Sequence, residues 1–383
     1  MDSMSNSALT EIDFAEVIAK NGGRAFRVGG SVRDSFMGRP SKDIDYSVVG
    51  MVRKKFKILF PEAEDMGKAF PVFHLVIGGI KREVAFARTE QKVGDYKGFK
   101  ISAKPKITVE EDLFRRDTTV NSIALDILTG EIIDPFHGIE DIKAKVLRAT
   151  GQHFCDDPMR ALRLAGQSAR FGFTIDCDTL PLAMAAQEEL AHEPVERMIH
   201  ELSIVLSEAA EPGRFFKVLA ETRLLQITFK EISDLSMGEF ERVVNGLDSV
   251  AKATQNSKVR FATFGLVLNK ERLELWNNRM KLPGGWLDAA ITVNQTIGIL
   301  EHPTPDKIVD TINTLRRGSL TIEEFDLISN AAGLKIPQLA PLKAIMVLPK
   351  GVVVPTTLQG KEIGEWLRKK HVEKISKEIY FGD

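Results

Sequence analysis

A pair of glycines between an apolar segment and a charged one constrains the start of this chain more than any other feature. Residues 25–28 are predicted to form a short apolar strand. Gly29 and Gly30 are predicted to form the turn that connects this strand to a helix beginning near Ser31. Paired glycines let a backbone approach a triphosphate closely, and the N–H groups at a helix start attract anions. Arg33 adds a forked cation that suits phosphate oxygens. The turn is therefore a candidate phosphate-binding site.

Two carboxylates follow this turn, at positions two residues apart. On a strand, alternate side chains lie on the same face, so Asp43 and Asp45 are predicted to point the same way. Neighbouring carboxylates repel unless a cation lies between them, and Mg²⁺ bound by carboxylates and substrate phosphates meets that need. A Gly-Gly pair alone is more often a plain turn, and Asp-x-Asp alone is more often found at a strand end or as a cap. The two motifs in this order and at this spacing indicate a catalytic site far more specifically. Together they predict a metal-dependent nucleotidyl transfer site.

The composition narrows the class of protein. A length of 383 residues is enough for two or three domains, and 43% hydrophobic and 27% charged residues are typical of a soluble protein. We expect neither a membrane span nor a secretory signal, because no apolar run is long enough for either. The only cysteines, Cys155 and Cys177, do not form a metal-type pair and indicate a reducing cytoplasm. The net charge of −1 does not by itself indicate nucleic-acid binding, so a polyanion would have to be bound by local basic patches.

Hydrophobic spacing divides the chain into a mixed part and a helical part. Up to about residue 150, short apolar segments alternate with turns, and hairpins are predicted around residues 78–79 and 129–130. From Asp156 onward the spacing is helical, and Pro158 behind Asp157 marks a helix start at its first position. The predicted fold class is α+β, an α/β head of mixed sheet and helices followed by an all-helical neck and body. The predicted segments are an N-terminal extension (1–24), the head (25–150), the neck (151–215) and the body with its tail (216–383).

A second motif follows in the predicted head. Arg115, Arg116 and Asp117 precede the segment 118–124, an arrangement that an exposed ion-pair cluster and a helix cap would also explain. With this motif, the chain resembles the CCA-adding enzymes (tRNA nucleotidyltransferases) of the bacterial and eukaryotic class and the related bacterial poly(A) polymerases. Their head carries G-G-x-V-R-D, D-x-D and R-R-D-x-T-x-N-[AS]-x-A in this order. The resemblance is strong over about residues 25–210.

The resemblance implies a nucleotidyltransferase head, with a role for each matching position. Asp43 and Asp45 are implied to be the catalytic pair that binds the metal, activates the 3′-hydroxyl of the RNA and steadies the triphosphate. Glu83, on the neighbouring predicted strand, is either a third carboxylate or an exposed strand residue. The residues implied to bind the nucleotide are Gly29, Gly30, Arg33, Arg116, Asp117, Asp157, Arg160 and Arg163.

The helix that starts the neck carries the implied base-reading motif. Asp157 and Arg160 match the second acid and the arginine of the family's E-D-x-x-R, with Asp156 in place of the glutamate. In the family, this pair reads the Watson–Crick edge of the incoming base, since arginine donates and aspartate accepts. From the residues alone, a helix cap paired with an arginine is the alternative. Gly166 stands where a further arginine is expected after Arg163, so reduced nucleotide affinity, a changed preference between CTP and ATP, and partial loss of function stay open.

The last part of the chain resembles the family less. One bacterial group carries an HD phosphohydrolase domain, but here Leu266 and Val267 occupy the positions of its His and Asp metal ligands. Because apolar side chains do not bind metals, we expect a helical scaffold in which the HD metal site is lost. This RNA-binding body is expected to hold the tRNA. The basic segment 361–377 is its candidate phosphate contact, with a plain solvent-facing helix as the alternative.

The motifs and the resemblance together predict template-independent addition of CMP and AMP from CTP and ATP to the 3′ end of tRNA, with Mg²⁺ as cofactor. The expected partners are tRNA, ATP and CTP, with no membrane; monomer and dimer are both open. A poly(A) polymerase, or an enzyme that adds only CC or only A, shares the head motifs. A catalytically inactive RNA-binding relative is the rival from another class, suggested by Gly166. Transfer to a small molecule ranks last, because it leaves the helical body without a purpose.

Overall fold

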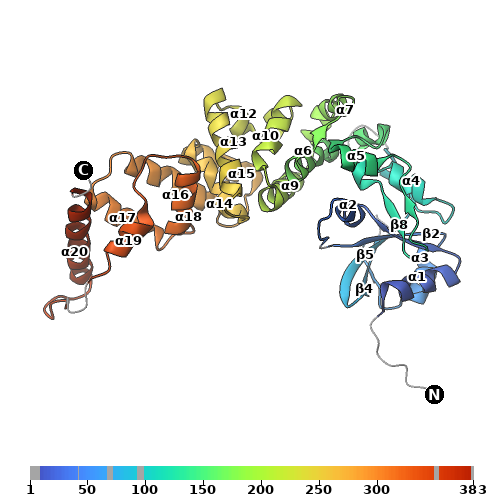
Figure 1. Cartoon of the computed structure of the whole chain (residues 1–383), viewed down its shortest axis with the longest axis horizontal. Helices are drawn as coiled ribbons and strands as arrows, with labels where there is room; N and C mark the ends of the chain where they lie inside the picture. The colour runs from blue at the N-terminus through green and yellow to red at the C-terminus, as the bar shows by residue number, and fades with distance from the viewer. Residues whose placement is uncertain (1–8, 42, 67–71, 93–98, 349–352, 381–383) are drawn as a thin grey trace, which may run out of the picture. The chain divides into compact units, whose positions relative to one another are not determined.

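The computed structural model of the chain describes residues 9–41, 43–66, 72–92, 99–348 and 353–380. It divides into two compact units: unit 1 comprises residues 1–168 and 172–193, and unit 2 comprises residues 169–171 and 194–383. In Figure 1 the strands lie in the blue-to-green part of the chain, and the yellow-to-red part is helical. The predicted α+β class, a mixed-sheet head followed by a helical body, is confirmed. The division into four segments stays a prediction.

A mixed sheet of seven strands forms the centre of unit 1, in the order β3-β4-β5-β2-β1-β8-β9. β2 and β5 are parallel, and the other neighbours are antiparallel. Both predicted hairpins are present, as β4-β5 and β8-β9. The strands are β1 (Arg24–Val28), β2 (Asp45–Val49), β3 (Glu64–Asp65), β4 (Val72–Ile77), β5 (Ile80–Phe86), β8 (Ala124–Asp126) and β9 (Ile132–Ile133).

Two small sheets complete the strands of the described residues. One pairs β6 (Thr89–Lys92) with β7 (Phe99–Ser102), and the other pairs β10 (Val146–Leu147) with β11 (Thr174–Ile175). β11 corrects the prediction that the chain is helical throughout after Asp156. A strand of two residues is too short to produce an alternating pattern, so only its pairing with β10 defines it.

Unit 1 also contains several helices. They are α1 (Glu11–Lys20), α2 (Gly30–Phe36), α3 (Arg53–Leu59), α4 (Val109–Phe114), α5 (Gly138–Ala144), α6 (Met159–Phe171), α7 (Thr179–Ala185) and α8 (Gln187–Leu190), with short 3-10 turns η1 (Thr119–Asn121) and η2 (Gln152–Asp156). α1 begins with a capping box at Thr10 and buries Phe14 and Ile18, one helical turn apart, in the same apolar core as Phe56 and Phe86. Part of the predicted N-terminal extension therefore packs into the head.

Unit 2 is built from helices around its own apolar core. The helices are α9 (Val195–Glu208), α10 (Pro212–Glu221), α11 (Leu225–Thr228), α12 (Lys230–Ser233), α13 (Met237–Ala251), α14 (Ser257–Ala262), η3 (Thr263–Leu266), α15 (Lys270–Met280), α16 (Trp286–Leu300), α17 (Pro305–Leu315), α18 (Ile322–Ala331), α19 (Leu339–Ile345) and α20 (Lys361–Tyr380). Pro212 and Pro305 each occupy the first position of a helix, where a missing N–H costs nothing. Leu266, at a lost HD position, packs against the core. No helix among the described residues is long and apolar enough to cross a bilayer.

Candidate active site

A cavity of about 370 Å³ opens in unit 1. It is lined by the ends of β1 and β2, by β5, and by the first turns of α2 and α6. Asp43 and Asp157, both described by the structure, lie outside its lining. The predicted site residues that line it are Gly29, Gly30, Arg33, Asp45, Arg116, Asp117, Arg160 and Arg163. These predicted site residues, which lie between Gly29 and Arg163 in the chain, thus meet in one hollow.

The glycine turn is shaped by its backbone conformation and by the crowding around it. Gly29 has a φ of +69°, in the left-handed region that favours glycine, and it precedes the first residue of α2. A Cβ atom at this position would lie 2.8 Å from Nη1 of Arg116. The N–H of Gly29 donates to the carbonyl of Ile123, 3.3 Å away, so anion binding at this turn has to use the following N–H groups. Gly29 therefore provides the shape of the turn and the room for Arg116.

Asp45 is the carboxylate that the sheet places in the cavity. It is the first residue of β2, in register with Val28 of β1 on one side and with Glu83 of β5 on the other. Asp45 is exposed at the mouth of the cavity, but the groups around it still reduce its hydration and raise its pKa. Glu83 and Asp43 raise the pKa further, whereas Arg116 opposes the shift. A cation beside Asp45 would relieve this excess of negative charge, so these residues fit a divalent metal. Glu83 lines the same cavity and is also an exposed residue of β5, so both interpretations of this carboxylate stay open.

Asp43 departs from the predicted strand geometry. β2 begins at Asp45, so Asp43 lies before the strand and is exposed. The expectation that a strand carries both side chains on one face is therefore wrong for this pair. The ladder with β1 begins at the Val28–Asp45 pair, where the glycine turn ends β1 and leaves Asp43 without a partner strand residue. The two carboxylates still influence each other, because Asp43 contributes to the raised pKa of Asp45.

Two arginines predicted to contact the triphosphate are oriented by acidic and amide side chains. The buried Arg33 donates from Nη1 to Oδ1 of Asn121 (2.6 Å) and from Nη2 to Oδ1 of Asp34 (2.7 Å). Arg116 donates from Nη2 to Oδ2 of the buried Asp112 (3.3 Å). Burial raises the pKa of Asp112, but its arginine neighbours more than offset this and hold the pKa below its ordinary value. Ionised Asp112 can therefore act as an anchor for Arg116.

The base-reading motif lies at the start of α6. Asp157 accepts from the N–H of Met159 (3.0 Å), so the capping role that the residues alone suggested is present. Arg160 donates to the carbonyl of His153, and its Nη2 lies 3.8 Å from Oε2 of Glu90. Its Nε atom is buried without a hydrogen-bond partner. The helix itself begins at Met159 with Pro158 as its cap, one residue later than predicted.

Several residues of the site were not singled out from the sequence. Glu90 pairs with Arg88 (2.9 Å), with Arg115 (3.1 Å) and, at longer range, with Arg160. Asn121 links Arg33 to Asp117, since its amide oxygen accepts from one and its amide nitrogen donates to the other. The signals available were that Asn121 belongs to the R-R-D-x-T-x-N motif and that residues 87–90 also resemble a stretch of the family. The roles themselves depend on contacts between distant segments. Gly166 is buried on α6, at the position where an arginine was expected.

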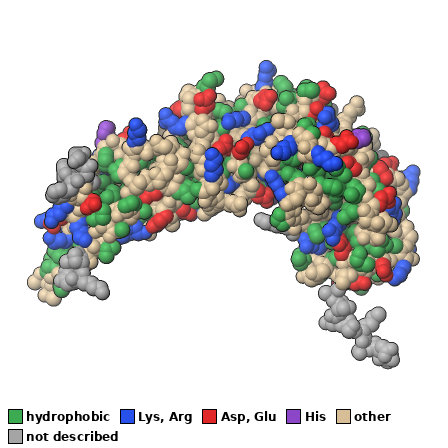
Figure 2. Space-filling view, viewed as in Figure 1, with side chains coloured by type: hydrophobic (Ala, Val, Ile, Leu, Met, Phe, Trp, Pro, Cys, Tyr) green, Lys and Arg blue, Asp and Glu red, His purple; other side chains and the backbone are tan. Residues whose placement is uncertain are grey.

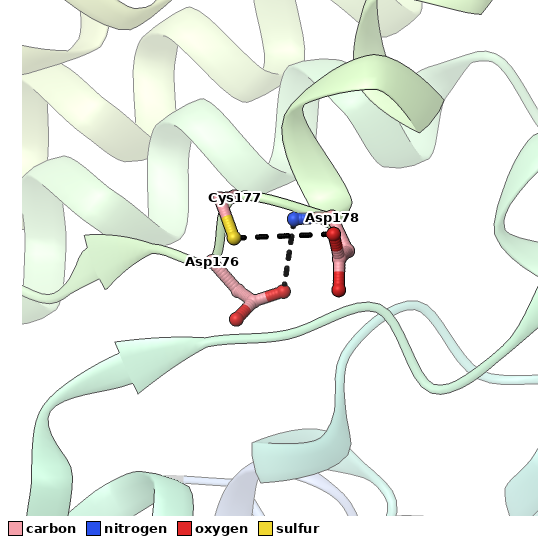
Figure 3. A group of neighbouring side chains, drawn as sticks. All are labelled: Asp176, Cys177 and Asp178. Carbon is pink, nitrogen blue, oxygen red and sulfur yellow. Dashed lines mark hydrogen bonds between the residues drawn. The ribbon is translucent and has the colours of Figure 1, made fainter.

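Outside the cavity, one group of potential metal ligands exists in the described residues. Asp176, Cys177 and Asp178 have ligand atoms within 4.8 Å of one another, in the turn between β11 and α7 (Figure 3). Asp176 accepts from the N–H of Asp178 (3.1 Å), and its other oxygen pairs with Arg148 (2.8 Å). These bonds are those of an ordinary turn with an ion pair. We therefore assign no metal to this group.

Comparison with known proteins agrees with this geometry. The family described as the poly A polymerase head domain matches residues 25–148, and a probable RNA and SrmB-binding site of polymerase A matches residues 172–235. A CCA-adding enzyme of Coxiella burnetii is 39% identical over 279 residues, 70% of each chain. A multifunctional CCA protein of Nitrosococcus oceani is 31% identical over 406 residues, 93% of this chain and 98% of that protein.

The solved structures extend the likeness to the fold of the whole chain. A CCA-adding enzyme in an apo form matches with a TM-score of 0.71 at 22% identity, covering 96% of this chain and 94% of the other. By the first of these matches, residues 25–148 of unit 1 are similar to the head domain of the poly(A) polymerases. The curated relatives go further: the chain belongs to the CCA-adding enzymes, the tRNA nucleotidyltransferases. Membership of this family implies the use of a divalent metal.

Proposed function

We propose that this protein builds or repairs the CCA terminus of tRNA by adding CMP and AMP from CTP and ATP, with Mg²⁺ as its metal. The observation that carries the proposal is the joint lining of one cavity by the glycine turn, by Asp45 and by two arginines of α6. Nucleotidyl transfer needs these three kinds of group side by side: a turn that binds the triphosphate, a carboxylate near the reacting phosphorus, and side chains that contact the nucleotide. The names of the curated relatives support tRNA as the acceptor.

The residues of unit 1 suit each step of the transfer. Arg33 and Arg116 line the cavity near the glycine turn and are proposed to bind triphosphate oxygens. Asp45 lines the same cavity, which supports its proposed place beside the reacting α-phosphate. Bound by Asp45 with Asp43, Mg²⁺ would stabilise charge on the attacking and leaving oxygens. The 3′-oxygen of the tRNA forms a bond to the α-phosphorus while the bond from that phosphorus to the pyrophosphate oxygen breaks, and the hydroxyl proton passes to solvent water. Asp157 and Arg160 select the base by accepting and donating hydrogen bonds.

The division into an N-terminal extension, a head, a neck and a body is kept as a proposal. Of these four segments, the neck and the body are proposed to hold the tRNA. On the face that Figure 2 shows, basic and acidic side chains are interspersed over most of the surface. Part of the basic charge of α20 serves the fold, since Arg368 pairs with Asp310 (2.6 Å) and Lys374 donates to the carbonyl of Val347 (2.6 Å). The remaining lysines of α20 are left as candidate phosphate contacts. The cytoplasm is the proposed location, supported by the free thiols of Cys155 and Cys177.

The proposed function is tested with three tRNA transcripts that end at the discriminator base, at C and at CC. Each is incubated with the protein, Mg²⁺ and labelled CTP or ATP, and the products are sized at single-nucleotide resolution. We expect ordered growth to CCA that stops there, which would also show that Gly166 is compatible with activity. Long A-tails would indicate a poly(A) polymerase, and a halt after CC or one A would indicate a partial enzyme. Binding of tRNA without incorporation would contradict the proposal.

Replacement of Gly29 by alanine should raise the KM for CTP and ATP roughly tenfold, through strain of about 1 kcal/mol and displacement of Arg116. The new Cβ would lie 2.8 Å from the Arg116 guanidinium at a φ of +69°. Steady-state kinetics with CTP on the transcript that ends at the discriminator base, and with ATP on the CC-ending transcript, measure the effect. Gly38→Ala is the matched control, because Gly38 has a φ of +66° with nothing within 4 Å of its Cβ position. An equal rise in KM in both variants would contradict the role of Arg116.

A further inference from the structure

A buried glutamine contacts the nucleotide-binding motif from inside the protein. Nε2 of Gln167, on α6, donates to Oδ2 of Asp117 (3.1 Å), and Oγ1 of Thr118 donates to Oε1 of Gln167 (2.8 Å). Gln167 is 4% exposed, Asp117 8% and Thr118 0%. Two consecutive residues thus engage both polar atoms of one carboxamide. The glutamine ties the side chains of Asp117 and Thr118 to α6.

The Asp117 carboxylate in turn contacts a cavity-lining arginine. Its Oδ2 lies 3.2 Å from Nε of Arg163, while Oδ1 accepts from the N–H of Thr118 (2.8 Å) and from Nδ2 of Asn121 (3.0 Å). Arg163 and Gln167 are four residues apart on α6, so both face the same carboxylate. Burial raises the pKa of Asp117, but Arg163 and the hydrogen bonds from Asn121 and Thr118 hold it below its ordinary value. Asp117 is therefore an ionised bridge between Gln167 and Arg163.

We infer that Gln167 is a positioning residue for nucleotide binding: it holds the Asp117 carboxylate where that carboxylate orients Arg163 into the cavity. The inference rests on the proposed function, in which Arg163 contacts the incoming nucleotide. An arginine side chain that is already oriented loses less conformational freedom when a nucleotide binds, so it binds more tightly. Gly166, beside Gln167, offers no side chain for this task. In this chain it is Gln167 that connects this turn of α6 to Asp117 of the R-R-D motif.

Gln167→Met tests the inference, because methionine has a similar volume and neither donates to Asp117 as the amide does nor accepts strongly. We expect the KM for CTP and ATP, and the dissociation constant of CTP measured by calorimetry, to rise roughly tenfold while kcat stays within about twofold. Ser168→Ala is the matched control. Its hydroxyl, also buried on α6, donates to the carbonyl of Phe173 (2.8 Å), so the variant loses a buried hydrogen bond outside the Asp117 network.

Gln167→Glu adds a signature that a merely structural role would not produce. Protonated, the new carboxyl group can donate to Asp117 and accept from Thr118, as the amide does. Ionised, it repels Asp117, so the proton is held to an unusually high pH. The charged groups facing this position are Asp117 and Arg163, with Arg160 acting on Asp117 from further along α6. We expect the ratio of variant to wild-type KM to rise roughly tenfold between pH 6 and pH 9.

The outcomes separate the inference from the proposed function. An unchanged dissociation constant for CTP in Gln167→Met, or an equal rise in Ser168→Ala, would overturn the role of Gln167. A pH-independent KM ratio for Gln167→Glu would overturn it as well. If the wild-type protein binds CTP but incorporates nothing into any transcript, the proposed function fails. The dissociation constants of the same variants then still decide the role of Gln167, because binding is measured without turnover.

Discussion

Asp45→Asn should abolish nucleotide incorporation, lowering the single-turnover rate roughly a thousandfold, which corresponds to about 4 kcal/mol of transition-state stabilisation. Asparagine keeps the size of the side chain but removes the charge. Asp45 is the carboxylate that begins β2 inside the cavity, in register with Glu83. Under the proposed function, a divalent metal would lose a ligand next to the reacting phosphorus. The measurement is rapid-quench incorporation of one AMP into the CC-ending transcript at saturating ATP.

The same substitution should leave the fold at least as stable in metal-free buffer at neutral pH. The pKa of Asp45 is raised in the folded protein by its surroundings and by Glu83. Ionising Asp45 is therefore less favourable in the folded protein than in the unfolded chain. At a pH above the ordinary carboxyl pKa this difference lowers the stability of the fold, and the neutral amide of asparagine removes it. Such a combination of lost activity and retained stability is typical of residues kept for function.

Asp65→Asn is the control for Asp45→Asn. Asp65 is an exposed carboxylate of β3, an edge strand of the same sheet, and it pairs with Arg53 (2.5 Å) at the surface. We expect its rate to stay within about twofold of wild type, because surface ion pairs contribute little. A rate for Asp45→Asn within tenfold of wild type would remove this carboxylate from the chemistry. A lower melting temperature in metal-free buffer would contradict the interpretation of its raised pKa.

Arg260→Met should destabilise unit 2 by about 3–5 kcal/mol, the largest stability effect that we expect. Arg260 is 2% exposed. Its guanidinium donates to the carbonyls of Leu206 (3.1 Å) and Ala209 (2.8 Å) at the end of α9, of Ala251 (3.0 Å) at the end of α13, and of Thr254 (2.6 Å). Carbonyls at helix C-termini lack helical partners and carry partial negative charge. Methionine fills the space but leaves these carbonyls without their donor.

Tryptophan fluorescence can follow this loss in unit 2. The three tryptophans of the chain, at positions 276, 286 and 366, all belong to unit 2, so urea unfolding monitored by their emission reports on that unit. Arg272→Met is the matched control, since this surface guanidinium donates to the carbonyl of Asp234 over 3.4 Å. We expect the control to change the unfolding free energy by less than about 0.5 kcal/mol. A loss below about 1 kcal/mol in Arg260→Met would show that water or neighbouring groups replace its hydrogen bonds.

Local features of the fold were predictable because neighbours in the chain determine them. The glycine turn after β1 and both hairpins follow from φ preferences and hydrophobic spacing within a few residues. Errors occurred where spacing gives no local signal. β2 begins at Asp45 instead of including Asp43, since strand ends depend on the partner strand. β11 is too short for any pattern.

The sequence by itself determined the fold class and which residues carry the motifs of the family, because both are written in short, contiguous patterns. Only the tertiary structure decided which of these residues meet. Arg33 reaches Asn121 across 88 positions, and Gln167 reaches Asp117 across 50. Such partners are selected by the packing of whole strands and helices, where a buried polar atom must find its hydrogen bond in whatever segment lies beside it. No pattern within one segment contains that information.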